Sequence, residues 1–241
     1  MILMIYFNNQ HITYRINAEL INETPLSIGA GRGALFGGID NPIIRMNGIP
    51  FIPGSSIKGV LRAEAEKYAN VKGWPVCDVV SNPNYEMDMK ENLKDKYEPC
   101  IVCSVFGGPT VASQITVLNA TPIGECRTET RTCVSICRIT GGQYPGRLFD
   151  IEYITPHSRF EWGLIIEGYD IVNGVGREVE LINYLIKKLI NDGVWIGGRR
   201  SVGHGLVKMN IRKISRESIV NGELKSEDCT DKYLKLLGVK H

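Results

Sequence analysis

The sequence predicts an α+β fold, and two periodicities and their order along the chain support this prediction. Apolar residues alternate with polar ones in short stretches, as in half-buried strands. Two longer stretches carry apolar residues at helical spacing. The expected elements are the strand 12–20, the helix 55–68, the strand 114–120, the strand 160–166, the helix 178–192 and the strand 207–211. This succession is the ferredoxin-like βαββαβ arrangement, which RNA-recognition domains share.

Each element follows from its own residues. Every second residue is apolar from Ile12 to Leu20 and from Phe160 to Ile166, which predicts two strands of the core. The helix 178–192 has a continuous apolar face and is followed by Gly193, a residue type that is common just beyond a helix end. The pair of aromatic residues with which RNA-recognition domains stack bases is not visible, so we expect RNA binding through loops and helix ends.

Composition favours one cytoplasmic globular domain that spans 1–241. The chain has 241 residues, of which 43% are hydrophobic, and a formal net charge of +2, which allows a sizeable core and RNA binding through a local basic patch. We expect insertions at about 70–112 and about 122–157. The apolar start MILMIYF is too short for a signal peptide or a membrane span, so no membrane partner is expected.

The stretch from Gly37 to Arg62 indicates a grip on a phosphate backbone. Ser55 and Ser56 are natural N-caps, and free backbone N–H groups at a helix start can bind an anion. Lys58 and Arg62 lie four residues apart, a spacing at which like charges repel unless a polyanion lies across them. The alternative is a surface helix with an ordinary cap.

An acidic residue, Asp40, precedes this helix in a loop rich in glycine. The glycines over Leu26–Gly38 resemble a nucleotide-binding loop, but the GxxxxGK[ST] pattern is missing and no helix follows directly. We therefore reject nucleotide binding. Asp40 is a candidate for acid–base or metal chemistry, and the alternative is a turn residue that caps its own loop.

A second glycine-rich segment, IGGRRSVGHGLVKM, connects the second helix to the last strand. It contributes Gly197, Gly198, Arg199, Arg200, Ser201, Gly203, His204 and Gly205. Exposed backbone N–H groups and guanidiniums suit phosphates and sugars. The alternative is a helix-to-strand connection that needs positive φ angles. His204 alone indicates a loop histidine with a local hydrogen bond rather than a catalytic base.

A long β-hairpin is predicted over Thr128–Pro156, with a broad glycine-rich tip at Gly141–Gly146. Its basic residues are Arg127, Arg131, Arg138 and Arg147. A plain solvated hairpin would not need so many arginines, so we expect RNA along its sides.

Three cysteines are candidates for a structural zinc site. Cys100 and Cys103 form a Cys-x-x-Cys motif, and Cys77 lies upstream. Zinc prefers four tetrahedral nitrogen or sulfur ligands, and the fourth ligand is open among Cys126, Cys137, Asp78 and the histidines. The alternative is a set of buried thiols.

Several of these segments resemble a known family. IPGSSIKGVLR resembles the signature of the RAMP superfamily, the repeat-associated proteins of CRISPR systems, and the loop 197–205 resembles its second glycine-rich hallmark. GGIDNPIIR resembles a loop of the superfamily's target-RNA-cleaving backbone subunit in type III effector complexes. Arg138-Ile139-Thr140-Gly141 and Glu152 match the same pattern.

The resemblance implies a fold, partners and a division of roles. The insertion 70–112 would be a lid with zinc, and 122–157 a thumb hairpin that wedges through paired guide and target RNA. Asp40 would cleave the target RNA with Mg²⁺ or Mn²⁺, in a filament of copies of this chain bound to other effector subunits. The implied RNA-binding residues are Arg45, Ser55, Ser56, Lys58, Arg62, Arg131, Arg138, Gly197, Gly198, Arg199, Arg200, Ser201, Gly203 and His204.

Three alternatives remain open at the level of sequence. The chain could be a non-catalytic guide-RNA binder of the same superfamily. It could be a guide-processing endonuclease, which would rely on a histidine such as His11, His157 or His204. It could also be an unrelated RNA-binding protein with the same order of elements, since a fold alone does not settle function.

Overall fold

The computed structural model describes residues 12–31, 38–77, 99–108, 111–220 and 223–239. The apolar start of the chain and most of the expected lid, with Asp78, lie outside the described residues. Within the part that is described, no helix is both long and apolar enough to cross a membrane.

The centre of the fold is an antiparallel sheet, so the α+β class is confirmed. Its strands are ordered β11 (Glu223–Asp228), β10 (Leu206–Val220), β1 (Ile12–Asn22), β8 (Arg159–Glu167) and β4 (Ile115–Val117). Two short strands extend it, because β5 (Thr121–Pro122) pairs with β8 and β9 (Val194–Trp195) pairs with β10. The last strand runs beyond the predicted 207–211 because β1 and β11 both pair with its second half.

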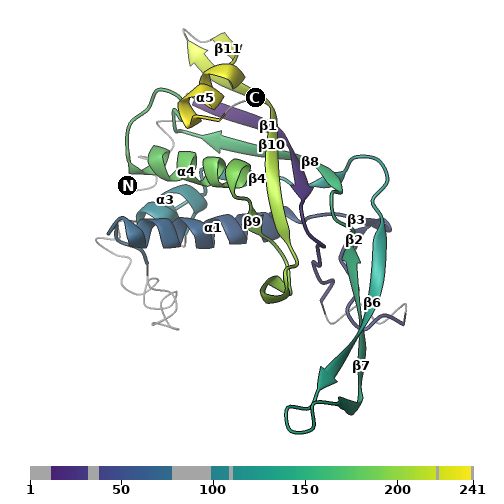
Figure 1. The fold of residues 1–241 in the computed structure, drawn as a ribbon. Helices are drawn as coiled ribbons and strands as arrows, with labels where there is room; N and C mark the ends of the chain where they lie inside the picture. Colours follow the sequence, from purple (N-terminus) through teal and green to yellow (C-terminus); the bar gives the residue numbers. More distant parts are fainter. Residues whose placement is uncertain (1–11, 32–37, 78–98, 109–110, 221–222, 240–241) are drawn as a thin grey trace.

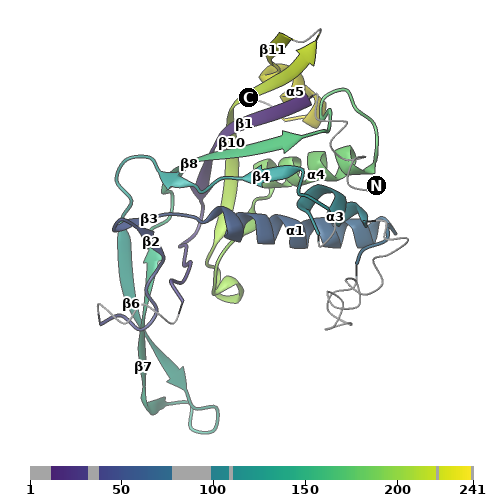
Figure 2. The same ribbon diagram turned by 180° about the vertical axis from the view of Figure 1, so that it is seen from behind.

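Three helices pack together on one side of this sheet (Figures 1 and 2): α1 (Gly54–Val71), α3 (Ile101–Phe106) and α4 (Arg177–Asn191). A fourth, α5 (Thr230–Leu237), packs on β10 at the end of the sheet near β11. Helix α3 was not predicted, because the sequence CIVCSVFGG was interpreted only as a cysteine motif. All of its residues are buried.

The predicted periodicities account for the core. The apolar positions predicted for the first strand, for the strand 160–166 and for the second helix are buried, apart from Ile12 at the strand's start. The largest fully buried side chains include Tyr14, Ile16, Leu20, Phe160, Ile166 and Leu181. Gly193 follows α4 with φ +78°, as expected of the residue beyond a helix end.

The thumb hairpin is present and stands apart from the main sheet. Strands β6 (Thr128–Ile136) and β7 (Gln143–Ile154) form a two-stranded sheet with each other. Isolated bridges join the inner end of β7 to Leu26 and Asn41, and Figure 1 shows the hairpin projecting away from the body. The tip is tighter than predicted, because β7 already begins at Gln143 and Cys137 N–H donates to the Gly142 carbonyl at 2.8 Å. A small hairpin of β2 (Arg45–Met46) and β3 (Ile49–Pro50) precedes α1.

Candidate nucleic-acid interface

The candidate site lies where the thumb joins the body, because separate segments add to the inner end of β7. Ile154 exchanges backbone hydrogen bonds with Leu26, at 2.8 and 3.0 Å. On the same strand, Asn41 donates to the Asp150 carbonyl at 3.0 Å and accepts from the Glu152 N–H at 3.1 Å. The base of the thumb therefore holds both the segment that follows β1, through Leu26, and the loop that carries Asp40.

Asp40 is exposed at this junction. Its Oδ2 atom accepts a hydrogen bond from the backbone N–H of Asp150 at 2.8 Å. The neighbouring Asn41 side chain donates to the Asp150 carbonyl at 3.2 Å. The Asp150 carboxylate is engaged elsewhere, since it accepts from the Thr132 hydroxyl at 2.6 Å. Asp40 is thus held at a fixed point on the thumb while remaining open to a ligand.

A buried ion pair supports the Asp40 loop. Glu152 is 5% exposed and accepts from the Ile43 N–H at 3.0 Å and from Nη1 of Arg45 at 2.8 Å, while Nη2 of Arg45 contacts its other oxygen. The Arg45 guanidinium and the Ile43 N–H hold the pKa of Glu152 below its usual range, although burial opposes this. The guanidinium of Arg45, a residue that the resemblance assigned to RNA, therefore binds Glu152 within the protein.

The start of α1 differs from the prediction. Ser55 and Ser56 are not the N-cap: the cap residue is Pro53, and no side chain of its own caps the helix. Instead, Gly54 N–H donates to Oδ1 of Asn119 at 2.8 Å. The prediction failed because the cap comes from a residue far along the chain, on the segment after β4.

Gly54 is required for packing within the protein rather than for close approach of a ligand. A Cβ atom at this position would lie 2.3 Å from the Val117 carbonyl oxygen. The next N–H groups are partly used, because Ser56 donates to the Pro53 carbonyl at 3.0 Å. The helix start therefore offers fewer free donors to an anion than the sequence suggested.

The two basic residues of α1 that were predicted to bind RNA, Lys58 and Arg62, contact other parts of the protein. Nζ of Lys58 donates to the Ser113 hydroxyl at 2.8 Å. Arg62 contacts Glu66 at 3.2 Å, the Gly107 carbonyl at 2.9 Å and the Cys103 sulfur at 3.4 Å. Burial, and then the charge of Arg62, lower the pKa of Lys58.

The second glycine-rich loop combines structural and exposed positions. A Cβ at Gly197 would lie 2.3 Å from the Ser27 carbonyl oxygen, and one at Gly205 would lie 2.1 Å from that of Ile196, and both have positive φ. Gly203, at φ +85°, faces open space, and Gly198 donates to the Ser27 carbonyl at 2.8 Å. The connection thus needs two of its glycines for packing, and leaves the segment around Gly203 accessible.

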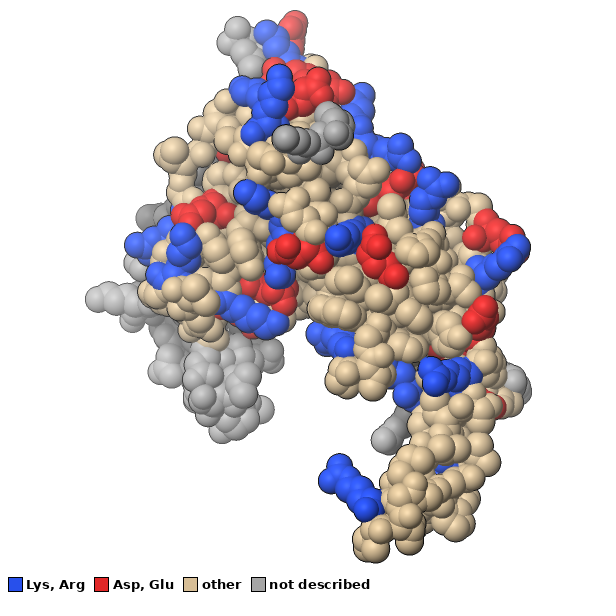
Figure 3. Space-filling view, viewed as in Figure 1, with Lys and Arg blue, Asp and Glu red and all other residues tan. Residues whose placement is uncertain are grey.

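The cations of this loop meet the thumb. Arg199, itself at φ +59°, places its guanidinium 5.2 Å from the centre of the Phe149 ring on β7. Arg200 and Ser201, in the short 3-10 turn η1 (Arg200–Val202), are exposed. Figure 3 shows basic side chains on both sides of the hollow between the body and the thumb. The hollow is therefore a suitable seat for a polyanion.

His204 packs locally, as predicted. Its ring is 8% exposed, lies 3.2 Å from the Ser27 hydroxyl through Nδ1, and meets the Tyr153 ring edge-on at 5.7 Å. Burial lowers its pKa, and the charges of Arg199 and Arg131 add to the effect. Thumb and loop thus bring positive charge to the same imidazole, which favours the neutral ring at neutral pH.

The structure divides the predicted site residues into groups. Asp40, Arg45, Arg131 and the loop 197–204 gather at the thumb base, and α1 contacts β9, which leads into that loop. Arg138 is exposed at the thumb tip, whereas Lys58 and Arg62 face the segment 103–113. Sequence reasoning missed the roles of Asn119 and Phe149, for which no local signal exists.

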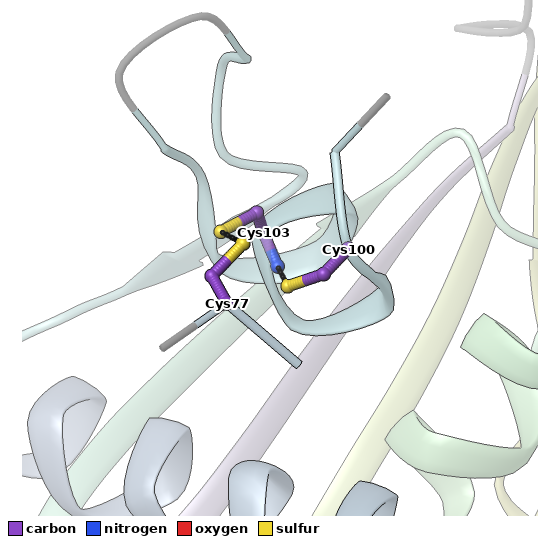
Figure 4. Close-up of side chains that lie close together, drawn as sticks. All are labelled: Cys77, Cys100 and Cys103. Carbon is purple, nitrogen blue, oxygen red and sulfur yellow. Dashed lines mark hydrogen bonds between the residues drawn. The ribbon is translucent and has the colours of Figure 1, made fainter. Parts of the chain in front are cut away.

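The three candidate cysteines lie together (Figure 4). The sulfur atoms of Cys77, Cys100 and Cys103 lie within 4.8 Å of one another, and the Cys103 thiol donates to Cys77 at 3.8 Å. The hydrogen bond between the two thiols lowers the pKa of Cys100 and raises the pKa of Cys103, which burial raises further. Among the described residues the group does not include Cys126 or Cys137.

Known proteins resemble this chain over most of its length. A family model described as the RAMP superfamily matches residues 20–208. The chain belongs to the RAMP superfamily. It is similar to proteins named "CRISPR system Cms endoribonuclease Csm3". The one from Streptococcus thermophilus is 30% identical over 80% of this chain and 85% of its own length. That from Methanothermobacter thermautotrophicus is 26% identical over 86% and 87%, and that from Methanocaldococcus jannaschii 26% over 80% and 76%.

The assignment of the α1 cap to Asn119 can be tested by stability. Asn119→Ala removes the acceptor for the Gly54 N–H and is expected to cost about 1 kcal/mol of unfolding free energy. Ser55→Ala, at the position that the sequence suggested, should change it by less than about 0.5 kcal/mol. Urea unfolding of both variants measures this, and a larger loss for Ser55→Ala would contradict the assignment.

The Glu152 ion pair predicts a pH dependence of stability. Because the pKa of Glu152 is lower in the folded chain than its ordinary 4.5, the pair stabilises the fold above that value. The contribution is lost as the pH falls through the folded pKa. Glu152→Gln should cost about 1–3 kcal/mol at neutral pH, and this difference from the parent chain should shrink in acid. Denaturant unfolding across pH measures it, and a difference that does not change with pH would refute the ion pair.

Proposed function

We propose that this chain is a backbone subunit of a type III CRISPR effector complex that binds guide RNA and cleaves paired target RNA. The observation that carries the proposal is the position of Asp40, exposed and held by the Asp150 N–H at the base of the thumb. The similar proteins are named as endoribonucleases of a CRISPR system, which supports the same class of activity.

The guide RNA would follow the hollow between the thumb and the glycine-rich loop. Arg131, Arg200 and the backbone around Gly203 line that path and are exposed. Phosphate contacts of this kind hold an RNA without reading its sequence, so selection of the target would come from pairing with the guide. Arg138 at the thumb tip would contact RNA further from the body.

Cleavage would be attack of a 2′-hydroxyl on its own phosphodiester. The 2′ oxygen bonds to phosphorus, the bond from phosphorus to the 5′ oxygen breaks, and the 5′ oxygen takes a proton from water, so the products carry a 2′,3′-cyclic phosphate and a 5′-hydroxyl. An A-form duplex keeps these atoms out of line, and a nucleotide bent around the thumb base can reach the in-line arrangement. Asp40 would accept the proton from the 2′-hydroxyl.

A divalent cation fits the exposed carboxylate of Asp40. Mg²⁺ and Mn²⁺ prefer oxygen ligands and keep several waters, so one carboxylate with RNA phosphate oxygens suffices to hold either ion. Such an ion supplies charge stabilisation at the phosphate. Asp150 is a weaker candidate ligand, because its carboxylate accepts from Thr132.

The cysteine cluster is proposed as a structural zinc site of the lid. Three thiols within 4.8 Å of one another supply the sulfur ligands that zinc prefers. Its role would be to fix the segment around α3 against α1. We also infer a ferredoxin-like core, for which the succession β1, α1, β4, β8, α4 and β10 is the support.

Assembly into a filament of copies, with other effector subunits at its ends, is part of the proposal. Several large apolar side chains of the thumb are exposed, among them Ile139 at 95% and Leu148 at 58%. Apolar surface of this kind is usually covered by a partner or a ligand, which is consistent with thumbs that contact RNA and neighbouring copies.

The second candidate function is a guide-RNA binder without nuclease activity. The hydrogen bond between Asp40 and the Asp150 N–H favours it, because a turn residue that only fixes its loop would make the same contact. A guide-processing role that relies on His204 is disfavoured, since that ring is buried and its pKa is lowered.

Asp40→Asn separates these functions. The substitution keeps an oxygen for the Asp150 N–H but removes the negative charge, so guide and target binding should be retained and metal-dependent cleavage should fall by at least about 100-fold. Target RNA cleavage by the assembled complex with Mg²⁺ or Mn²⁺ measures it, with fragments read at single-nucleotide resolution. Asp192→Asn, at the far end of α4, is the matched control. Normal cutting by the Asp40 variant would show that Asp40 is not the active residue, whereas a parent complex that binds target RNA without cutting it would leave only the binding function.

The role of Arg200 predicts a change in salt dependence. If Arg200 contacts one phosphate, Arg200→Ala should weaken guide-RNA binding for all sequences and reduce the slope of log affinity against log salt by about 1. Lys67→Ala is the control, since Lys67 pairs with Glu64 on the exposed side of α1. Filter binding across salt concentrations measures both, and an unchanged slope for Arg200→Ala would place the RNA elsewhere.

A further inference from the structure

We propose that Arg62 acts on the cysteine cluster rather than on RNA, as the positive charge that balances three thiolates around a bound Zn²⁺. This inference rests on the proposed zinc site, and it reassigns a residue of the segment IPGSSIKGVLR. Arg62 would be a positioning residue for the metal, because it touches a ligand and not the ion.

The contacts of Arg62 are all with groups of the protein, and one of them is a cysteine of the cluster. From the third turn of α1, Nη2 donates to the Cys103 sulfur at 3.4 Å and Nη1 donates to the Gly107 carbonyl at 2.9 Å. Nε donates to Glu66 at 3.2 Å. The guanidinium therefore bridges α1 to α3 itself and to the residue that follows α3, and its three nitrogens all have partners inside the chain.

The charge balance explains why a cation belongs there. Three thiolates and one Zn²⁺ carry a net charge of −1, and Cys103 is buried at 2% exposure. An unbalanced charge at a buried site is costly. A guanidinium that donates to a ligating sulfur offsets part of that charge, although it also pairs with the half-exposed Glu66 at 3.2 Å, and it fixes the ligand's orientation, as outer-shell partners of metal ligands do. The Cys103 N–H assists in the same way, by donating to the Cys100 sulfur at 3.5 Å.

Lys58 provides the contrast on the same face of the helix. It lies one turn earlier, and its ammonium donates to the Ser113 hydroxyl at 2.8 Å, with no contact to a sulfur. An ammonium on that hydroxyl can leave it for a phosphate at small cost, whereas Arg62 would have to give up a thiol, a carbonyl and a carboxylate. Within the signature segment, the lysine and the arginine thus have separate roles.

The test is metal affinity of the full-length chain, with Co²⁺ as the spectroscopic probe for Zn²⁺. Bound Co²⁺ has thiolate charge-transfer bands, and competition with a chelator gives its dissociation constant. Arg62→Met keeps the apolar stem and loses the charge, and is expected to weaken Co²⁺ binding about 10- to 100-fold. Arg62→Lys keeps the charge without the fork and should lie between. Lys58→Met is the matched control and should bind Co²⁺ as the parent chain does.

The outcomes distinguish the role of Arg62 from the existence of the zinc site. Parent-like Co²⁺ affinity in Arg62→Met would overturn the role of Arg62 while leaving the zinc site intact. A parent chain that gives no thiolate bands with Co²⁺ would overturn the zinc site and this inference together. If Arg62→Met instead lowered the salt slope of guide-RNA binding by about 1 with unchanged Co²⁺ affinity, Arg62 would be a phosphate contact. Circular dichroism of each variant, with and without Zn²⁺, shows whether it folds.

Discussion

A single buried carboxylate joins the loop of Asp40 to the thumb, and the geometry of the whole junction depends on it. Glu152 sits on β7, yet its oxygens bind Ile43 and Arg45 from the loop, and its backbone carbonyl accepts from Ser27 at 3.2 Å. A buried carboxylate without such partners would be strongly destabilising. The three segments therefore have one arrangement in which the charge is satisfied, and in that arrangement Asp40 lies on the thumb.

Contacts within the chain also determine which basic residues remain free to bind a ligand such as RNA. Arg45 and Arg62 both belong to segments that resemble family signatures, but both direct their guanidiniums at partners inside the chain. Arg200 and Arg138 have no such role and are exposed. A basic residue in a signature-like segment can thus have a structural role, and under the proposed function fewer basic residues are left for RNA than the signatures suggest.

Local sequence patterns predicted the helices and strands well, but they could not predict contacts between residues far apart in the sequence. The alternation in β1 and the apolar face of α4 depend on neighbours in sequence, so they could be recognised directly. The cap of α1 could not, because Asn119 lies 65 residues from Gly54. The contacts of Arg62 with Cys103 and Gly107 also join residues far apart in the sequence, so local patterns did not predict them. The three cysteines were recognised because their chemistry, unlike that of an asparagine, has few alternative uses.

The position of Asp40 connects binding to cutting. Because its carboxylate is held by a backbone N–H of β7, it sits at the root of the hairpin, where the thumb leaves the body, and not at the tip. In the proposed function, an RNA strand displaced by the thumb passes this root, whatever its sequence. Distortion of the strand and the proposed proton acceptor are then supplied by the same structural element, so a chain that binds without its thumb engaged would not cut. One such root per copy would also make the spacing of cuts equal to the spacing of copies.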